Sequence, residues 1–132
     1  NASVRVFTVL EGCHNFCEIA ILYTSAAFHM PDLWEMPCRP PVKDSGKAGE
    51  RAHTYRLAGP TCLAGDVVGD YSFDQPLTEG SQIVLEDMAL YTMVKTNTFN
   101  GMPLPDIALR HEDGQVELVK SLGYEDFKSR LG

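Results

Sequence analysis

The chain has 132 residues, 44% of them apolar, with 11 basic against 18 acidic side chains, so its formal net charge is −7. This composition excludes an intrinsically disordered protein and fits one globular domain that buries roughly 65–70% of its extended surface. The negative charge argues against nucleic acid or an anionic membrane surface as partner, and the longest apolar run, at 19–23, is too short to span a membrane.

The predicted elements, taken in chain order, are mainly strands. Segments rich in β-branched and aromatic residues predict strands at 4–10 and 18–24, joined by a turn at 11–15. Four of the eight prolines and a polar run fall at 31–50, which predicts one long loop. Five further strands are expected at 53–57, 82–87, 89–96, 107–110 and 115–120, the last two as a hairpin. Helical composition is found near the end, at 124–130.

Seven short strands separated by turn residues predict a mainly β fold. The expected architecture is an antiparallel, Greek-key-like β-barrel with a short C-terminal helix. The chain starts at Asn1 and Ala2 with no initiator Met, so we expect these two residues to be a tag remnant and the chain to be a piece of a longer protein.

Acidic residues are concentrated in one stretch of the chain. Between Leu57 and Val94 there is no Lys or Arg, whereas six carboxylates fall there: Asp66, Asp70, Asp74, Glu79, Glu86 and Asp87. The simpler interpretation is a solvated acidic face. The alternative is an electrostatic field that attracts a polyamine-like cation.

The four cysteines, at 13, 17, 38 and 62, form no regular disulfide framework, which favours free thiols in a reducing, cytoplasmic setting. The pair Cys13 and Cys17, with His14 between them, offers zinc-type ligands. Structural zinc sites combine two such clusters, and the sequence has no second one, so no metal is expected.

Two segments carry a more specific pattern. Residues 59–66 read Gly-Pro-Thr-Cys-Leu-Ala-Gly-Asp, and residues 91–101 read Tyr-Thr-Met-Val-Lys-Thr-Asn-Thr-Phe-Asn-Gly. Together they resemble the C-terminal β-domain of the pyridoxal-phosphate decarboxylases of the alanine racemase fold type, which include ornithine and diaminopimelate decarboxylases. Segments 29–32, 35–37 and 69–74 resemble the carboxynorspermidine/carboxyspermidine branch. The similarity runs from about Thr8 to the end of the chain.

The resemblance implies a two-domain enzyme of polyamine biosynthesis. Its N-terminal (β/α)₈ barrel would hold pyridoxal phosphate through a lysine and a Gly-rich loop that this chain lacks. Residues 1–132 would be the C-terminal domain, which completes the active site across a homodimer interface. We therefore expect the chain to be inactive alone, and its substrate class to be an amino acid with a polyamine tail.

Cys62 is the expected catalytic residue. It follows Gly-Pro on a predicted loop, and a thiol near a cationic cofactor can deliver a proton to a carbanion. The resemblance gives Cys62 this role in the partner subunit's active site, after carbon dioxide has left. The alternative is a small buried apolar side chain, the commoner fate of a free cysteine.

Asp66 is the expected acceptor for a substrate ammonium, because a carboxylate pairs with an amine through a charge-assisted hydrogen bond. Ornithine decarboxylases carry the acid directly after the cysteine. Leu63 occupies that position here, so the amine would have to reach further. The alternative is that Asp66 caps a turn.

The second segment supplies three more expected site residues. The resemblance places the Tyr91 hydroxyl near the cofactor phosphate, and a phenol is a suitable neutral donor to phosphate. Phe99 and Asn100 are expected at the border of the substrate pocket. An ordinary strand tyrosine and a tight Asn-Gly turn are the alternatives.

Three residues of the proline-rich stretch and its approach complete the expected site. Arg39 resembles the Arg-Pro that holds a substrate carboxylate in diaminopimelate decarboxylases, since a guanidinium pairs with carboxylates through two parallel bonds. Its alternative is a surface arginine on a loop. His29 and Asp32 are expected to line an amine channel. Tyr23 departs from the family pattern, in which we expect an aspartate that contacts substrate.

Two other functions are consistent with the same pattern. One is a stand-alone binding or regulatory module that docks onto a full-length decarboxylase. The other is a sister decarboxylase acting on diaminopimelate or ornithine.

Overall fold

The computed structural model describes residues 2–10, by their backbone alone, and residues 18–132. Its strands are β1 (Ala2–Leu10), β2 (Glu18–Leu22), β3 (Gly46–Lys47), β4 (His53–Ala58), β5 (Val67–Phe73), β6 (Gln82–Leu85), β7 (Ile107–Arg110) and β8 (Val116–Lys120). Its helices are short: α1 (Ala26–His29), α2 (Asp32–Glu35), α3 (Thr92–Lys95), the 3₁₀ turn η1 (Phe99–Gly101) and α4 (Tyr124–Lys128). The fold is mainly β, as predicted.

Six of the strands form one sheet with the order β3-β5-β4-β2-β1-β6, and β7 and β8 form a separate hairpin. Every pair is antiparallel except β2 with β4, which is parallel. Between β2 and β4 the chain passes through α1, α2 and β3, and such a long crossover returns a strand in the same direction. This parallel pair departs from the predicted antiparallel architecture, whereas the other strand pairs agree with it.

The described strands leave the sheet open, with β3 and β6 as its edges, so a closed barrel is not confirmed. The segment that leads into β3 nevertheless links the two edges, because it contacts β6 at one edge and then forms β3 at the other. Val42 forms an isolated antiparallel bridge with Leu85 of β6, and the Lys43 N–H donates to the Val84 carbonyl at 2.9 Å. A few residues later, Gly46 and Lys47 pair with β5.

Other element predictions met mixed outcomes. The hairpin and the C-terminal helix are confirmed as β7–β8 and α4. The predicted strand at 89–96 is wrong, because α3 forms there; its apolar Val94 is 85% exposed. Strand β5 was not predicted, since Gly69 and Asp70 interrupt its apolar pattern. The loop at 31–50 contains α2 and β3, and the turn at 11–15 lies outside the described residues.

The core lies on the inner face of the six-stranded sheet. Its largest fully buried side chains include Leu22 on β2, Leu57 on β4, Tyr71 on β5 and Leu85 on β6. Burial raises the pKa of Tyr71 to about 12. The buried phenol donates to the Pro40 carbonyl at 2.7 Å, which ties the proline-rich segment to the sheet.

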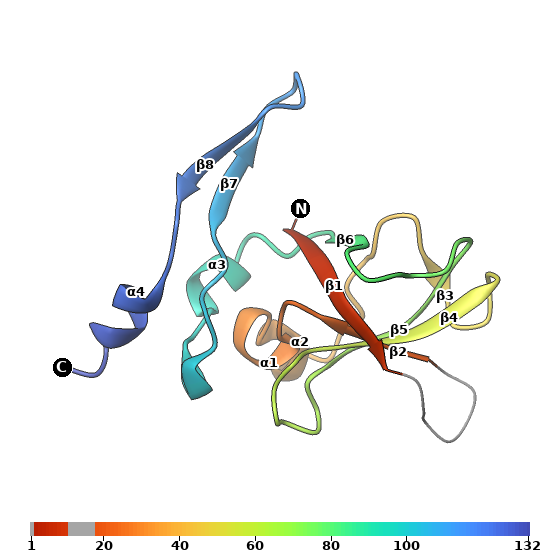
Figure 1. Cartoon of the computed structure of the whole chain (residues 1–132), viewed down its shortest axis with the longest axis horizontal. Helices are drawn as coiled ribbons and strands as arrows, with labels where there is room; N and C mark the ends of the chain where they lie inside the picture. Colours follow the sequence, from red (N-terminus) through yellow and green to blue (C-terminus); the bar gives the residue numbers. More distant parts are fainter. Residues whose placement is uncertain (1, 11–17) are drawn as a thin grey trace.

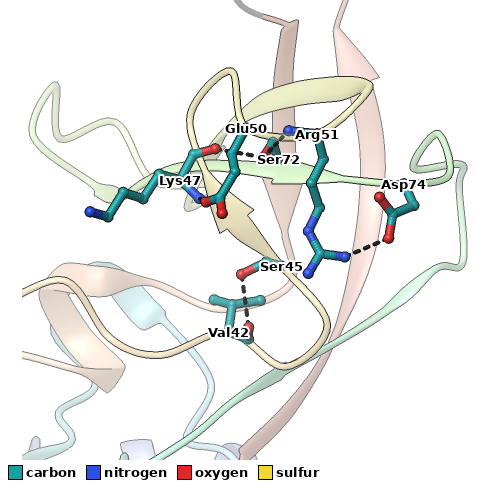
Figure 2. A network of polar contacts seen from close by, with 7 residues as sticks. All are labelled: Val42, Ser45, Lys47, Glu50, Arg51, Ser72 and Asp74. Carbon is teal, nitrogen blue, oxygen red and sulfur yellow. Dashed lines mark hydrogen bonds and ion pairs between the residues drawn. The ribbon is translucent and has the colours of Figure 1, made fainter.

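Side chains hold the two-residue strand β3 in place (Figure 2). The buried Ser72 hydroxyl donates to the Lys47 carbonyl at 2.5 Å and accepts from the Arg51 N–H at 3.0 Å. The Glu50 carboxylate accepts from the Lys47 N–H at 2.7 Å, and Arg51 forms an ion pair with Asp74. A strand too short to be stable through its ladder is thereby fixed by neighbouring polar groups.

The hairpin β7–β8 and helix α4 lie apart from the six-stranded sheet, on the far side of α1, α2 and α3 (Figure 1). Several apolar side chains here are more than half exposed: Leu109, Val116, Leu118, Val119, Tyr124 and Leu131. An isolated hairpin is at best marginally stable in water, and exposed apolar surface of this extent marks a contact region.

A substitution of Leu57 tests whether strand β4 lies in the core. We expect Leu57→Ala to lower the free energy of unfolding by about 2–5 kcal/mol, because it leaves a cavity among fully buried side chains. The matched control is Leu90→Ala, whose side chain is 82% exposed and whose truncation should change stability by less than about 0.5 kcal/mol. Urea denaturation followed by circular dichroism measures both; equal effects would contradict the burial of β4.

Candidate active site

The candidate site is built around the start of helix α1. Ser25 caps the helix: its backbone is extended, and its hydroxyl accepts from the Phe28 N–H at 3.2 Å. A Ser before Ala-Ala is a typical helix start. Because a helix of four residues is unstable by itself, contacts from other segments must hold it against the sheet.

Asp66, directly before β5, supplies the strongest of these contacts. Its side chain is 3% exposed. Oδ1 accepts hydrogen bonds from the Ser25 hydroxyl at 2.9 Å and the Ala26 N–H at 2.7 Å. Oδ2 accepts from the Thr61 hydroxyl at 2.6 Å. Both oxygens are engaged inside the protein, so the geometry fits a capping residue better than a substrate ligand.

His29, at the other end of α1, is 5% exposed. Its Nε2 lies 2.8 Å from the Pro103 carbonyl oxygen, which can only accept, so Nε2 carries the proton. Nδ1 then accepts from the Thr24 hydroxyl at 2.9 Å and the Ser25 N–H at 3.3 Å. Burial lowers the pKa of His29, while the Pro103 carbonyl and the Asp66 charge oppose that effect. His29 is thus a neutral, buried side chain that links helix α1 to Pro103. This geometry fits a residue that holds these segments together better than one that lines an amine channel.

Cys62 and Asn100 meet at an open cavity of about 340 Å³, lined by residues 60–62 and 100–103. The Cys62 thiol is exposed and free, so the alternative of a buried apolar cysteine is not what the structure shows. The Asn100 backbone is left-handed, with φ 57° and ψ 21°. Its Nδ2 donates toward the Cys62 sulfur at 3.7 Å. Two predicted site residues, distant in sequence, are therefore brought together.

Phe99 and Tyr91 are both largely exposed. Phe99 precedes Asn100 and packs edge-on against Phe28, with ring centroids 5.7 Å apart. Tyr91 directly precedes α3, and its ring centroid lies 5.7 Å from the Lys95 ammonium. Phe99 therefore borders the Cys62 region, whereas Tyr91 belongs to a second group around Lys95.

That second group joins helices α2 and α3. The Lys95 ammonium forms an ion pair with Asp32 at 2.6 Å and a second one with Glu35. The hydrogen bond to Asp32, followed by that to Glu35, raises the pKa of Lys95. The Asp32 carboxylate, expected to line an amine channel, pairs with an ammonium of the chain itself.

Arg39 has a structural environment. Its Nε and Nη2 donate to the Asp70 carbonyl at 3.3 and 3.1 Å, and Nη2 also donates to the Gly46 carbonyl at 3.0 Å. The guanidinium carbon lies 3.9 Å from the Tyr71 ring centroid. The Nε and Nη2 atoms of Arg39 thus hold the proline-rich segment to β5. This geometry does not favour the expected pairing of Arg39 with a substrate carboxylate.

The residues that sequence reasoning missed are mostly partners of predicted ones. Ser25 could have been found from the N-cap pattern. Thr61 and Pro103 could not, because a hydroxyl and a backbone carbonyl carry no pattern that predicts their buried partners. Among the described residues, no cluster of His, Cys, Asp or Glu is arranged to hold a metal ion; Cys13 and Cys17 lie outside them.

The fold is that of a domain found in amino acid decarboxylases. A crystal structure of diaminopimelate decarboxylase from M. jannaschii superposes with a TM-score of 0.73 over 97% of this chain and 29% of that one, at 18% identity. A crystal structure of carboxynorspermidine decarboxylase from Campylobacter jejuni, complexed with norspermidine, superposes with a TM-score of 0.88 over 97% of this chain and 37% of that one, at 35% identity.

Sequence identity to known proteins narrows the class of decarboxylase that this chain resembles. A carboxyaminopropylagmatine decarboxylase from Synechocystis sp. is 50% identical over 113 residues, 86% of this chain and 29% of that protein. A carboxynorspermidine/carboxyspermidine decarboxylase from Herminiimonas arsenicoxydans is 38% identical over 135 residues, 98% of this chain and 36% of that protein. The resemblance to the carboxynorspermidine/carboxyspermidine decarboxylases is thus confirmed, and the chain spans about a third of the length of these proteins. No protein-family model matches the chain.

The buried His29 predicts a pH dependence of stability. Its pKa is lowered in the folded protein, so the unfolded chain binds the proton more readily below the ordinary value of 6.5. The stabilising effect is complete above that value and is lost as pH falls toward the folded pKa. We expect the free energy of unfolding to fall as the pH drops below the ordinary His value of 6.5. His29→Gln should remove this part of the slope in urea denaturation; an unchanged slope would contradict the assignment.

Proposed function

We propose that the chain is the C-terminal domain of a pyridoxal-phosphate decarboxylase of polyamine biosynthesis. The full protein would remove carbon dioxide from carboxynorspermidine or carboxyspermidine. The observation that carries the proposal is the meeting of Cys62 and Asn100 at one cavity, on a chain that resembles these decarboxylases along almost its whole length. The neighbours' fold family supports the cofactor, whose lysine would lie in the part of the protein outside this chain.

Tyr91 of this chain is suited to contact the phosphate of such a cofactor. Pyridoxal phosphate would supply an electron sink for the carbanion left by decarboxylation. Tyr91 is 69% exposed and its ring lies beside the positive charge of Lys95, and a phenol there can donate to a phosphate oxygen. Tyr91 would thus hold the phosphate from outside the barrel domain.

Cys62 would act as the proton donor. After the carboxyl group leaves, the Sγ–H proton would pass to the substrate carbon, and the sulfur would become a thiolate. The Asn100 amide donates toward that sulfur, so it would stabilise the negative charge as it forms. Phe99, next in the chain, would supply an apolar border to the pocket.

Substrate attraction by an acidic field receives little support. Asp66 is buried, Asp70 pairs with Arg56 at 2.8 Å, and Asp74 pairs with Arg51. The Arg56 hydrogen bond lowers the pKa of Asp70, which keeps this pair charged and compensated. Three of the six carboxylates are therefore either buried or paired with an arginine of the chain, and Glu79 and Asp87 are exposed. This arrangement does not favour the field interpretation.

The exposed apolar surface of β7, β8 and α4 supports a larger assembly. In the full protein these side chains would be covered by the N-terminal domain and the second subunit of a homodimer. The short segment from Val42, which bridges to edge strand β6, to Gly46, which lies in edge strand β3, links the two edges and supports a barrel-like closure of the domain. The free thiols of Cys38 and Cys62 suit a cytoplasmic enzyme. Within the described residues, no helix has the length and apolarity to cross a membrane.

A second substrate is favoured by one observation. The Synechocystis relative named for carboxyaminopropylagmatine shares more identity with this chain than the carboxynorspermidine relative does. A guanidino-tailed substrate is therefore a candidate beside the polyamine-tailed ones. Tyr23, where we expect an aspartate in the family, lies at the end of β2 next to Thr24 and is 56% exposed, so it can contribute to this choice.

The role of Cys62 is tested by Cys62→Ala in the full-length protein. Positioned general acids contribute about 10²- to 10⁴-fold, so we expect kcat to fall by about that factor with less change in KM. Cys38→Ala, which removes another exposed free thiol, should leave kcat within about twofold. Carbon dioxide release measures both, and undiminished turnover by the Cys62 variant would reject the assignment.

The substrate class is tested by competition. The full-length protein should decarboxylate carboxynorspermidine, carboxyspermidine or carboxyaminopropylagmatine with kcat/KM at least about 100-fold above that for diaminopimelate or ornithine, because a long cationic tail adds binding contacts that a short diamino acid lacks. Mixed-substrate assays with product analysis give the ratios. A preference for either short diamino acid would overturn the polyamine proposal, and absence of decarboxylation would favour the binding-module alternative.

A further inference from the structure

The two walls of the Cys62 cavity come from segments distant in sequence. One wall is the loop 60–62, which carries Cys62, and the other is segment 100–103, which carries Asn100. Each wall is tied to helix α1 by one buried side chain. The separation between the sulfur and the Asn100 amide therefore depends on two anchors that do not themselves face the cavity.

Asp66 is the anchor of the first wall. Its carboxylate bonds the Thr61 hydroxyl at 2.6 Å on one side and the Ser25 hydroxyl at 2.9 Å on the other. The Gly59 N–H donates to the Asp66 carbonyl at 2.8 Å, and a Cβ on Gly59 would lie 2.1 Å from the Asp66 carboxylate. The loop before Cys62 is thus closed tightly around this carboxylate.

His29 is the anchor of the second wall. Its Nε2–H donates to the Pro103 carbonyl at 2.8 Å, while Nδ1 accepts from Thr24 and Ser25 at the start of the helix. The Asn97 N–H donates to the Phe28 carbonyl at 3.0 Å and so fixes the segment upstream of the wall. The three residues between Phe99 and Pro103 form no hydrogen bond to α1 among the described contacts, so the bond from His29 to Pro103 fixes the downstream end of this wall.

We infer that His29 is a positioning residue of the site, which holds segment 100–103 against the Cys62 loop so that the Asn100 amide reaches the sulfur. The functional part of this inference, that His29 supports catalysis, rests on the proposed role of Cys62. Its geometric content, that His29 controls the environment of the Cys62 thiol, can be measured without any decarboxylation.

Two matched variants of the full-length holoenzyme separate the bonds of His29. His29→Asn keeps an acceptor near the Nδ1 position but is too short to reach the Pro103 carbonyl. His29→Gln places an amide donor near the Nε2 position and should retain that bond. Alkylation by iodoacetamide, quantified at Cys62 by peptide mass spectrometry and referenced to Cys38, reports the thiolate fraction as a function of pH.

We expect His29→Asn to shift the pH midpoint of Cys62 alkylation upward and to slow the reaction near neutral pH by about threefold to tenfold, because the sulfur loses a donor. His29→Gln should restore both to near the wild-type values. Asn100→Ala should reproduce the shift, and adding His29→Asn to it should change the profile little further, since both act on the same contact. Circular dichroism checks that each variant is folded.

The inference is overturned if His29→Asn leaves the Cys62 profile unchanged while folded, if His29→Gln is as defective as His29→Asn, or if the effects of His29→Asn and Asn100→Ala simply add. The proposed function fails separately. Should Cys62→Ala leave turnover intact while the alkylation profiles behave as expected, the positioning by His29 stands and the catalytic role of Cys62 does not.

Discussion

The candidate site depends on the hydrogen bonds that the buried Asp66 carboxylate accepts. Removing an ionised carboxylate from water costs several kcal/mol unless donors compensate it, and here hydroxyls and N–H groups of two segments surround it. Helix α1 is too short to persist without such partners. The Cys62 loop and the helix cannot separate without leaving the charge unpaired, so one residue makes the two segments a unit.

This constraint divides the expected site residues into two kinds. Cys62, Phe99 and Asn100 are exposed and lie where two chain segments meet, so their side chains are available to a ligand. Asp66 and His29 are buried with their polar atoms paired, and they govern geometry. A motif shared by a family does not distinguish these kinds, because residues that hold a site and residues that perform its chemistry are both tied to the same positions.

Local pattern predicted the elements that depend on local chemistry. The hairpin β7–β8 follows from the turn Glu112-Asp113-Gly114, where Gly114 has a positive φ that glycine tolerates. Strand β5 escaped prediction because its stability comes from pairing with β4 on one side and β3 on the other. Helix α3 was mistaken for a strand because its apolar residues face outward and carry no information about the core. In both cases the outcome depended on how the segment is placed in the tertiary structure, which the sequence of one segment does not contain.

The net charge of −7 shows that counting residues along the sequence is equally limited as a guide to function. A count along the chain suggests a field around Cys62 and Asp66, yet a field requires charges that are uncompensated and close together. Asp66 is enclosed by hydrogen-bond donors, Asp70 is held by Arg56, and Asp32 is held by Lys95. Carboxylates of this chain thus act mainly as internal partners that fix segments to one another. Under the proposed function, recognition of a cationic substrate would depend on which carboxylates face the assembled pocket, and the number of acidic residues in a stretch does not determine that.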